Sequence, residues 1–405
     1  MNPAKQNIKR IDINYALLQG VFWLANASLG AFSVAYLTYR GLDNIQIGQS
    51  TSLNCLIAIL VQIVVANYLD KNMHIPIKNV ICAFFVLGIA LGIVLLKAPL
   101  GNVGIIIVFA LCVSILSLCN GFISAQMMQF KNVGIDANFG WPRGVGSLCY
   151  ALGSYAFGAL AGKYTEGTIP VFYVISLVFC AIFVMTMPNP YRLADPVEYA
   201  KTHHMDVEVT SYKEMILGNP LLMWTLICMM IYSIGQSAIL TYTVRAVERI
   251  GYGTTEYGLF EGLRALVEVP MLVASVWILK KVPMKHALVI SLVASGARGV
   301  MIACASSLGV LYSAAALNVI CSGIYVFAGV MFVNAIVRPT EKVRAQSLAS
   351  LFYSIGSVIG NYISGLMLEG IGLTGTMLIN AIICFLSGAF MYIVGKVEKS
   401  SKINS

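Results

Sequence analysis

The sequence predicts an all-α membrane protein with twelve transmembrane helices arranged as two pseudo-symmetric bundles of six. Three observations predict this class: few charged residues, a series of long apolar runs, and an uneven distribution of lysine and arginine. Of the 405 residues, 59% are hydrophobic and only 11% are charged, whereas a soluble domain has about 25% charged residues. A surface with so few charges is suited to lipid rather than to water.

The apolar runs are each long enough to cross a bilayer, which takes roughly 20 mostly apolar residues per helix. A polar stretch separates the first six runs from the last six. We therefore expect an N-terminal bundle at 1–188, a cytoplasmic central loop at 189–219 and a C-terminal bundle at 220–405. The predicted spans are, in order, 14–39, 45–69, 77–96, 103–130, 138–162, 169–187, 220–245, 256–279, 284–306, 309–337, 344–368 and 373–397.

The positive charges predict the orientation of these spans. If both termini are cytoplasmic, eighteen of the 26 lysines and arginines fall on the cytoplasmic side, five fall outside and three fall within spans. Cytoplasmic loops carry such an excess of lysine and arginine. We expect a multi-pass protein of the cell membrane with cytoplasmic termini, and the net charge of +9 does not make nucleic acid an expected partner.

An internal repeat supports the division into two halves. Residues 148–162 read LCYALGSYAFGALAG and residues 351–365 read LFYSIGSVIGNYISG. These segments belong to the fifth and the eleventh predicted spans, so they are six spans apart. Parallel repeats of this kind are typical of transporters. The second copy also contains Gly356 and Gly360 at a spacing that lets helix backbones approach closely.

Away from the ends of the predicted spans, five charged residues lie inside them, where a charge costs about 2.5–3.5 kcal/mol on insertion scales. They are Arg143, Glu261, Arg264, Glu268 and Arg298. Glu261, Arg264 and Glu268 are spaced i, i+3 and i+7, which places them on one helical face. We expect Glu268 to be the proton-coupling or substrate-binding acid, assisted by Arg264 and Arg298; alternatively, Glu268 only neutralises one of these arginines.

The surplus of arginine among these charges favours an anionic or hydroxyl-rich solute. Tyr150 lies seven residues after Arg143, on the same helical face. Asn26 and Asn120 are polar residues near the middle of their predicted spans. We expect these four residues to contribute to substrate binding.

The run Phe139-Gly-Trp-Pro-Arg143, followed by Tyr150, resembles the fifth span of the lactose permease branch of the major facilitator superfamily. This resemblance implies that Arg143 binds sugar hydroxyls and that Tyr150 stacks on a sugar ring. The pair Asp70-Lys71 resembles the cytoplasmic gating motif of the superfamily. The resemblance extends over nearly the whole chain and implies the major facilitator fold.

Other positions both follow and depart from that pattern. The segment that ends at Arg298 resembles the permease segment with the proton-coupling arginine. The histidine and glutamate of the permease's tenth span fall at Asn318 and Cys321, so Asn318 is added to the substrate-binding candidates. The permease's eighth-span glutamate aligns with Ala265, one turn before Glu268.

From these observations we expect a secondary active transporter that moves a sugar or oligosaccharide with a proton, and that needs no cofactor and no metal. The alternatives are the same fold carrying a nucleoside, an aromatic acid or a drug-like compound, or a facilitator without proton coupling. A membrane-embedded enzyme or a non-transporting sensor is a more distant alternative. The loop pair His203 and His204 is better explained as solvated than as a metal site.

Overall fold

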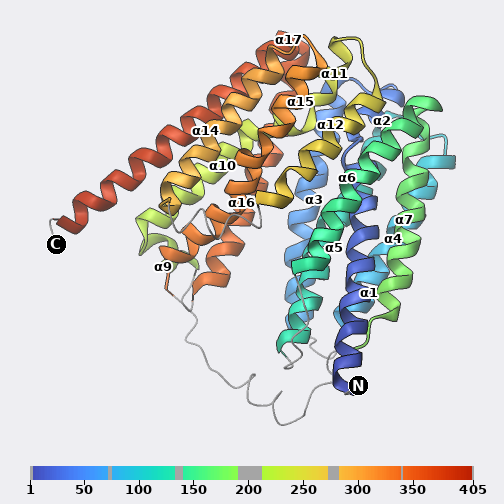
Figure 1. Cartoon of the computed structure of the whole chain (residues 1–405), viewed down its shortest axis with the longest axis horizontal. Coiled ribbons are helices and arrows are strands. Elements are labelled where there is room, and N and C mark those ends of the chain that lie inside the picture. The colour runs from blue at the N-terminus through green and yellow to red at the C-terminus, as the bar shows by residue number, and fades with distance from the viewer. Residues whose placement is uncertain are drawn as a thin grey trace. The chain divides into compact units, whose positions relative to one another are not determined.

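The computed structural model describes residues 3–71, 75–132, 140–189, 212–271, 282–338 and 341–403, and the regular secondary structure of these segments is entirely helical (Figure 1). The helical class predicted from the composition is therefore confirmed. The chain divides into two compact units. The first comprises Met1–Leu42 and Ile57–Asp206, and the second comprises Asp43–Leu56 and Val207–Ser405.

The first unit is a bundle in which α1 packs against α6 and α7, and α4 packs against α5 and α7. Fully buried apolar side chains fill the core of this unit, for example Phe22 of α1, Phe85 of α4 and Leu177 of α7. The helices of this unit are α1 (Pro3–Ala25), the π-helix η1 (Asn26–Gly30), α2 (Ser33–Tyr39), the later part of α3 (Asn44–Lys71), α4 (Ile77–Lys97), α5 (Asn102–Asn132), α6 (Gly140–Lys163), η2 (Glu166–Thr168) and α7 (Ile169–Thr186).

The second unit is built around α17, which packs along α10 and α14, while α14 also packs against α16. The backbone of α17 leaves the helical conformation at Gly372, where φ is 70°. A glycine adopts this left-handed φ without strain, so α17 contains two helices joined at that residue. The helices of this unit are α9 (Tyr212–Leu217), α10 (Pro220–Thr241), α11 (Thr243–Arg249), α12 (Thr254–Leu266), α14 (Met284–Ala303), α15 (Leu308–Ala316), α16 (Asn318–Ala335) and α17 (Lys342–Ile403).

The described segments contain nine helices that are long and apolar enough to cross a membrane, or ten if the bent pair Arg10–Gly30 and Ser33–Tyr39 is one span. One of the nine, Arg344–Val394, covers two predicted spans on either side of Gly372. The predicted span 256–279 is described only as far as Met271. These observations are consistent with the twelve predicted spans.

The internal repeat has a counterpart in how the helices pack. Gly153 on α6 faces α1, where an added Cβ would lie 2.5 Å from Leu24 Cδ2. Gly356, its partner in the repeat, faces α10, where an added Cβ would overlap the carbonyl oxygen of Met230 and lie 2.8 Å from Ser233 Cβ. In each unit, the equivalent glycine thus lets the same helix approach the first helix of the bundle.

The first predicted span of each unit is broken towards its end. In the first unit, α1 continues into η1 and then bends by 44° into α2. In the second unit, α10 ends at Thr241, and α11 begins after Tyr242, whose φ and ψ are −105° and 12°. A π-helix inside an α-helix is rare and often marks a functional segment. The paired breaks are a second structural sign of the repeat.

Candidate functional site

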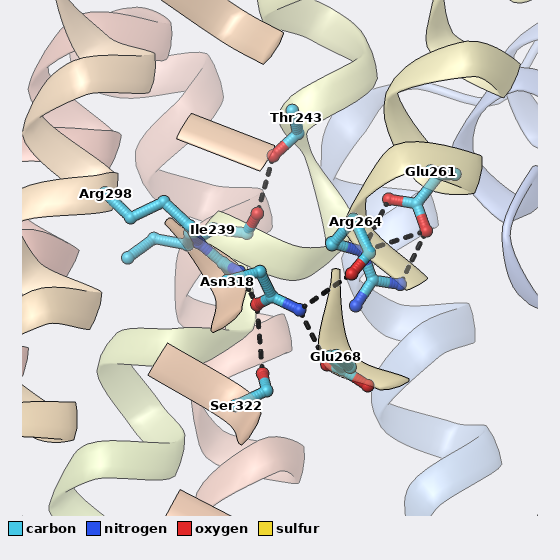
Figure 2. Close-up of polar contacts among 8 residues, drawn as sticks. All are labelled: Ile239, Thr243, Glu261, Arg264, Glu268, Arg298, Asn318 and Ser322. Atoms are coloured by element: carbon cyan, nitrogen blue, oxygen red, sulfur yellow. Dashed lines mark hydrogen bonds and ion pairs between the residues drawn. The ribbon is translucent and has the colours of Figure 1, made fainter. Parts of the chain in front are cut away.

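A hydrogen-bonded network in the second unit centres on the side chain of Asn318, the first residue of α16 (Figure 2). Its Nδ2 donates to Glu268 Oε1 at 2.6 Å and to the carbonyl oxygen of Arg264 at 3.3 Å. Its Oδ1 accepts hydrogen bonds from Arg298 Nη1 and from Ser322 Oγ, the latter at 3.0 Å. Both donor hydrogens of the amide and its acceptor oxygen are therefore engaged, so the orientation of Asn318 is fixed.

Proline shapes the position of Glu268. The helix α12 ends at Leu266, and Val267, which follows it, has φ and ψ of −71° and −17°, still in the right-handed helical region. Pro270 cannot donate a hydrogen bond to the carbonyl of Leu266, and its ring crowds that carbonyl. The carboxylate of Glu268, two residues before Pro270, reaches Asn318 on α16.

Glu261 and Arg264 form a separate ion pair within α12. The shortest contact, Arg264 Nη2 to Glu261 Oε2, is 2.5 Å, and Nε lies 3.1–3.2 Å from the two carboxylate oxygens. The side chain of Glu261 is 4% exposed and that of Arg264 is 19% exposed. Because this pair neutralises itself, the charge of Glu268 is left to balance Arg298.

Arg298 is the largest fully buried side chain of the described chain, at 1% exposure. Its Nη1 donates to Asn318, but Nε and Nη2 have no hydrogen-bond partner in the described segments. Leaving a buried donor unsatisfied costs about 1–3 kcal/mol, and more for a charged group. The two buried donors thus have hydrogen-bonding capacity that the described segments leave unused.

A chain of buried hydroxyl and amide groups runs next to this network. Tyr232 OH lies 2.9 Å from Ser295 Oγ and accepts a hydrogen bond from Gln236 Nε2 at 3.0 Å. Ser295 is three residues before Arg298 on α14. Sequence analysis missed Gln236 and Ser295 as candidates. The signal was available, because Ser291, Ser295 and Arg298 are spaced i, i+4 and i+7 on one face of the ninth span.

The aromatic ring of Tyr232 begins a row of three tyrosines. The ring centroids of Tyr232 and Tyr325 are 4.5 Å apart, and those of Tyr325 and Tyr353 are 6.1 Å apart. The row joins α10, α16 and α17, the helices that surround α14. Flat rings in such a row can stack on a planar solute.

A second polar cluster lies in the first unit, where Trp23 of α1 joins Arg143 and Tyr150 of α6. The guanidinium carbon of Arg143 is 4.2 Å from the centroid of the Trp23 ring, a cation–π distance. The Tyr150 ring packs edge to face on Trp23 with centroids 5.9 Å apart. Arg143 Nη1 also donates to Ser147 Oγ at 3.1 Å. The structure thus brings the two predicted residues to one indole.

The Trp23 indole is itself held by polar neighbours on α1. Its Nε1 donates to Gln19 Oε1 at 3.0 Å, and Gln19 Nε2 donates to Tyr15 OH at 2.8 Å. Sequence analysis did not select Tyr15, Gln19 or Trp23. Their spacing of four residues, which places all three on one helical face, is the signal that could have found them.

The remaining predicted residues lie apart from both clusters or cannot be placed. Asn26 is half-buried in η1, where Nδ2 donates to the carbonyl oxygen of Phe22 at 3.0 Å. Asn120 is exposed on α5. Asp70 and Lys71 end α3, and their side chains lie outside the described part of the chain.

The comparison with known families decides the class of the protein. The model of the MFS_1 like family matches residues 15–378. The chain belongs to the MFS_1 like family. The family assignment supports the major facilitator resemblance, while the lactose permease branch remains a prediction. No curated protein matches the sequence.

Several solved structures that resemble this MFS_1-like chain are transporters. The nucleoside transporter NupG aligns with a TM-score of 0.76 and 16% identity, covering 98% of this chain and 100% of that one. A bacterial homolog of the human lysosomal transporter Spinster, in its inward-facing, unoccupied conformation, gives 0.72 and 13%, with 98% of each chain covered. The peptide transporter POT gives 0.67 and 12%, covering 96% and 94%. At these identities the likeness shows the fold, so the MFS_1-like chain is an all-α, multi-pass membrane protein with a transporter fold.

Two Arg–Glu pairs at spacing i, i+3 allow a matched test of this MFS_1-like protein's stability. Glu261→Gln leaves the guanidinium of Arg264 without its buried counter-charge, and we expect a loss of about 3–5 kcal/mol of folding free energy. Glu248→Gln breaks the pair with Arg245, in which Glu248 is 38% exposed, and we expect a loss of about 0–1 kcal/mol. The thermal-unfolding midpoints of the purified variants measure the difference. Equal midpoints for the two variants would show that the Glu261 pair is not stabilising.

Proposed function

We propose that this MFS_1-like protein is a secondary transporter that carries a small polar solute, with a sugar or oligosaccharide as the first candidate, across the cytoplasmic membrane together with a proton. The observation that carries the proposal is the link from Arg298 through Asn318 to Glu268. A buried cation with two unmatched donors offers a binding group, and the carboxylate at the other end of the link offers a proton acceptor.

The proton is proposed to bind Glu268. This residue is only half-buried, whereas Arg298 and Asn318 are fully buried, so Glu268 is the end of the network that water can reach. Protonation removes the negative charge that balances Arg298 through the amide. Because of this change in charge, binding of the proton alters the affinity for the solute, and binding of the solute alters the affinity for the proton. Such a mutual effect is the requirement for coupling.

The cluster around Trp23 is proposed to bind the ring of the solute. Arginine donates several hydrogen bonds in a fixed plane and therefore suits neighbouring hydroxyl groups. The faces of Trp23 and Tyr150 suit the apolar C–H face of a sugar. This role for Arg143 and Tyr150 was expected from the sequence, and the contact with Trp23 supports it.

A nucleoside is the second candidate, and two observations favour it. A nucleoside contains a flat base, and the row Tyr232, Tyr325 and Tyr353 offers flat rings on which a base can stack. The NupG fold also aligns over the full length of that transporter. An aromatic acid, a drug-like compound and uncoupled facilitated diffusion remain alternatives of the same fold.

Transport is proposed to follow alternating access, in which the two halves of a transporter open a midplane site to one side at a time. The excess of lysine and arginine in the predicted cytoplasmic loops supports a cytoplasmic location for both termini. With this orientation, a proton gradient directed inwards drives uptake of the solute into the cell.

Uptake into proteoliposomes tests the proposal. Purified protein is reconstituted, and labelled sugars, oligosaccharides and nucleosides are offered with and without an inward proton gradient. We expect protein-dependent uptake of at least one compound, with accumulation above equilibrium only when the gradient is present. Uptake that stops at equilibrium in both conditions supports the facilitator instead, and the absence of any protein-dependent uptake contradicts the transport function.

A further inference from the structure

We infer that the Nε/Nη2 edge of Arg298 is a carboxylate subsite, so that the transported solute is an organic monoanion such as a sugar acid. This inference rests on the proposed transport function and names the chemical class of its substrate. It gives Arg298 a direct role in binding, in addition to the coupling role expected from the sequence.

The geometry of the Arg298 guanidinium supports binding of a carboxylate. Nη1 is already bonded to Asn318 Oδ1, which fixes the plane of the group. Nε and Nη2 form the opposite edge, and neither has a hydrogen-bond partner in the segments that the structure describes. Two parallel N–H donors on one edge match the two oxygens of a carboxylate, the bidentate arrangement for which arginine is suited.

The net charge of the network around Asn318 supports a solute with a single negative charge. Glu261 already neutralises Arg264, and Glu268 balances Arg298 through the amide of Asn318. When Glu268 takes up a proton, one positive charge is left on Arg298. A monoanionic carboxylate matches that charge, whereas a phosphate monoester, with a charge of about −1.5 to −2 at neutral pH, would exceed it.

The neighbouring titratable groups do not supply the missing negative charge. Cys321 of α16, together with Tyr353 and Cys384 of α17, lies within electrostatic reach of Arg298. Thiols and phenols are uncharged at neutral pH. Tyr232 of α10, whose hydroxyl lies 2.9 Å from Ser295 Oγ, is also a phenol and donates or accepts a hydrogen bond without carrying a charge.

Because Arg298 is buried, a solute can bind the subsite only after a change of conformation. Arg298 is 1% exposed, so a solute reaches it in a conformation other than the one described. Alternating access supplies such conformations. A carboxylate bound there is removed from water, which strengthens its attraction to the guanidinium.

Matched acid and neutral compounds test the subsite on the unmodified protein. The pairs are glucuronate with glucose, galacturonate with galactose, and orotidine with uridine, each differing by one carboxylate. Binding is read as the shift of the thermal-unfolding midpoint of the purified protein, and transport as uptake into proteoliposomes under an inward proton gradient. We expect at least one acid to bind at least tenfold more tightly than its neutral partner and to be accumulated.

Three outcomes overturn the subsite. Equal binding of acid and neutral partners, or binding of neutral compounds alone, overturns it and leaves the transport function standing. Tighter binding of inorganic phosphate than of every acid replaces the carboxylate with a phosphate. If no compound of either kind is bound or taken up, the subsite and the transport function both fail.

An arginine-to-lysine variant tests whether the preference for an acid over its neutral partner depends on the Nε/Nη2 edge of Arg298. Arg298→Lys keeps the charge but removes the bidentate edge, and we expect the preference for the acid to fall at least tenfold while the neutral partner is little affected. Arg249→Lys is the control, because Arg249 bonds Thr374 Oγ1 and the carbonyls of Ile302 and Ala305, outside the network. An acid preference that survives Arg298→Lys contradicts the subsite. The thermal-unfolding midpoint of each variant without added compound shows whether that variant is folded. The comparison of acids with neutral compounds on the unmodified protein tests the subsite even if a variant does not fold.

Discussion

Replacing Glu268 with glutamine is expected to abolish proton-driven accumulation while leaving exchange of the solute intact. A pH difference of one unit supplies ~1.4 kcal/mol per proton, which corresponds to a concentration ratio of roughly tenfold, and it drives a neutral and a monoanionic solute alike. Glutamine has the same shape and keeps an oxygen that can accept the hydrogen bond from Asn318 Nδ2. It cannot take up a proton, so the ratio should fall to one.

Two measurements on the same proteoliposomes separate the possible effects of this substitution. Accumulation under an inward proton gradient reports coupling, and exchange of labelled for unlabelled solute without a gradient reports binding and movement. Glu248→Gln is the matched control, because Glu248 is an exposed carboxylate that pairs with Arg245 and has no part in the network. A Glu268→Gln protein that still accumulates the solute to the wild-type ratio would falsify the assignment of the proton to this residue.

Replacing Gly356 with alanine is expected to destabilise the second unit by about 1–3 kcal/mol, the usual cost of overpacking. The added Cβ would overlap the carbonyl oxygen of Met230 and approach Ser233 Cβ to 2.8 Å. A carbonyl oxygen belongs to the backbone of α10 and cannot turn aside as a side chain can. The two helices must move apart, which loosens the packing of α17 along α10.

The control for Gly356→Ala is Gly370→Ala, which is expected to change the stability little or to raise it. Gly370 is also in α17, but an added Cβ there meets nothing within 4 Å. Alanine is favoured over glycine in a helix by about 1 kcal/mol, so Gly370→Ala should leave the unfolding midpoint unchanged or raise it slightly. Equal midpoints for the two alanine variants would show that α10 and α17 do not approach closely at Gly356.

The helical class and the positions of most spans followed from the sequence because they depend on local composition. Predicted spans such as 77–96 and 169–187 agree closely with α4 (Ile77–Lys97) and α7 (Ile169–Thr186). The boundary between the last two spans also fell beside Gly372. An apolar run must be helical in lipid, since only a helix satisfies its backbone hydrogen bonds within one segment.

The candidate site was only partly predictable. Charge inside an apolar run singled out Arg143, Glu268 and Arg298, because such residues are rare and costly. The arrangement around Asn318 could not be read from the sequence, since it depends on how α16 packs against α14 and on how close Glu268 comes to Asn318. Trp23 was missed because an aromatic residue in a span is usually an interface anchor or a packing group. Only its contacts with Arg143 and Tyr150 in the folded chain make it a binding candidate.

The sequence by itself determined that this chain is a helical membrane protein and which few charges it buries, because hydrophobic transfer and charge cost are properties of individual residues. Only the tertiary structure decided which of those charges meet: Glu261 with Arg264, and Glu268 with Arg298 through Asn318. Hydrogen bonds form between atoms about 3 Å apart, and residues separated by 20 or 50 positions in the chain reach that distance only when their helices pack.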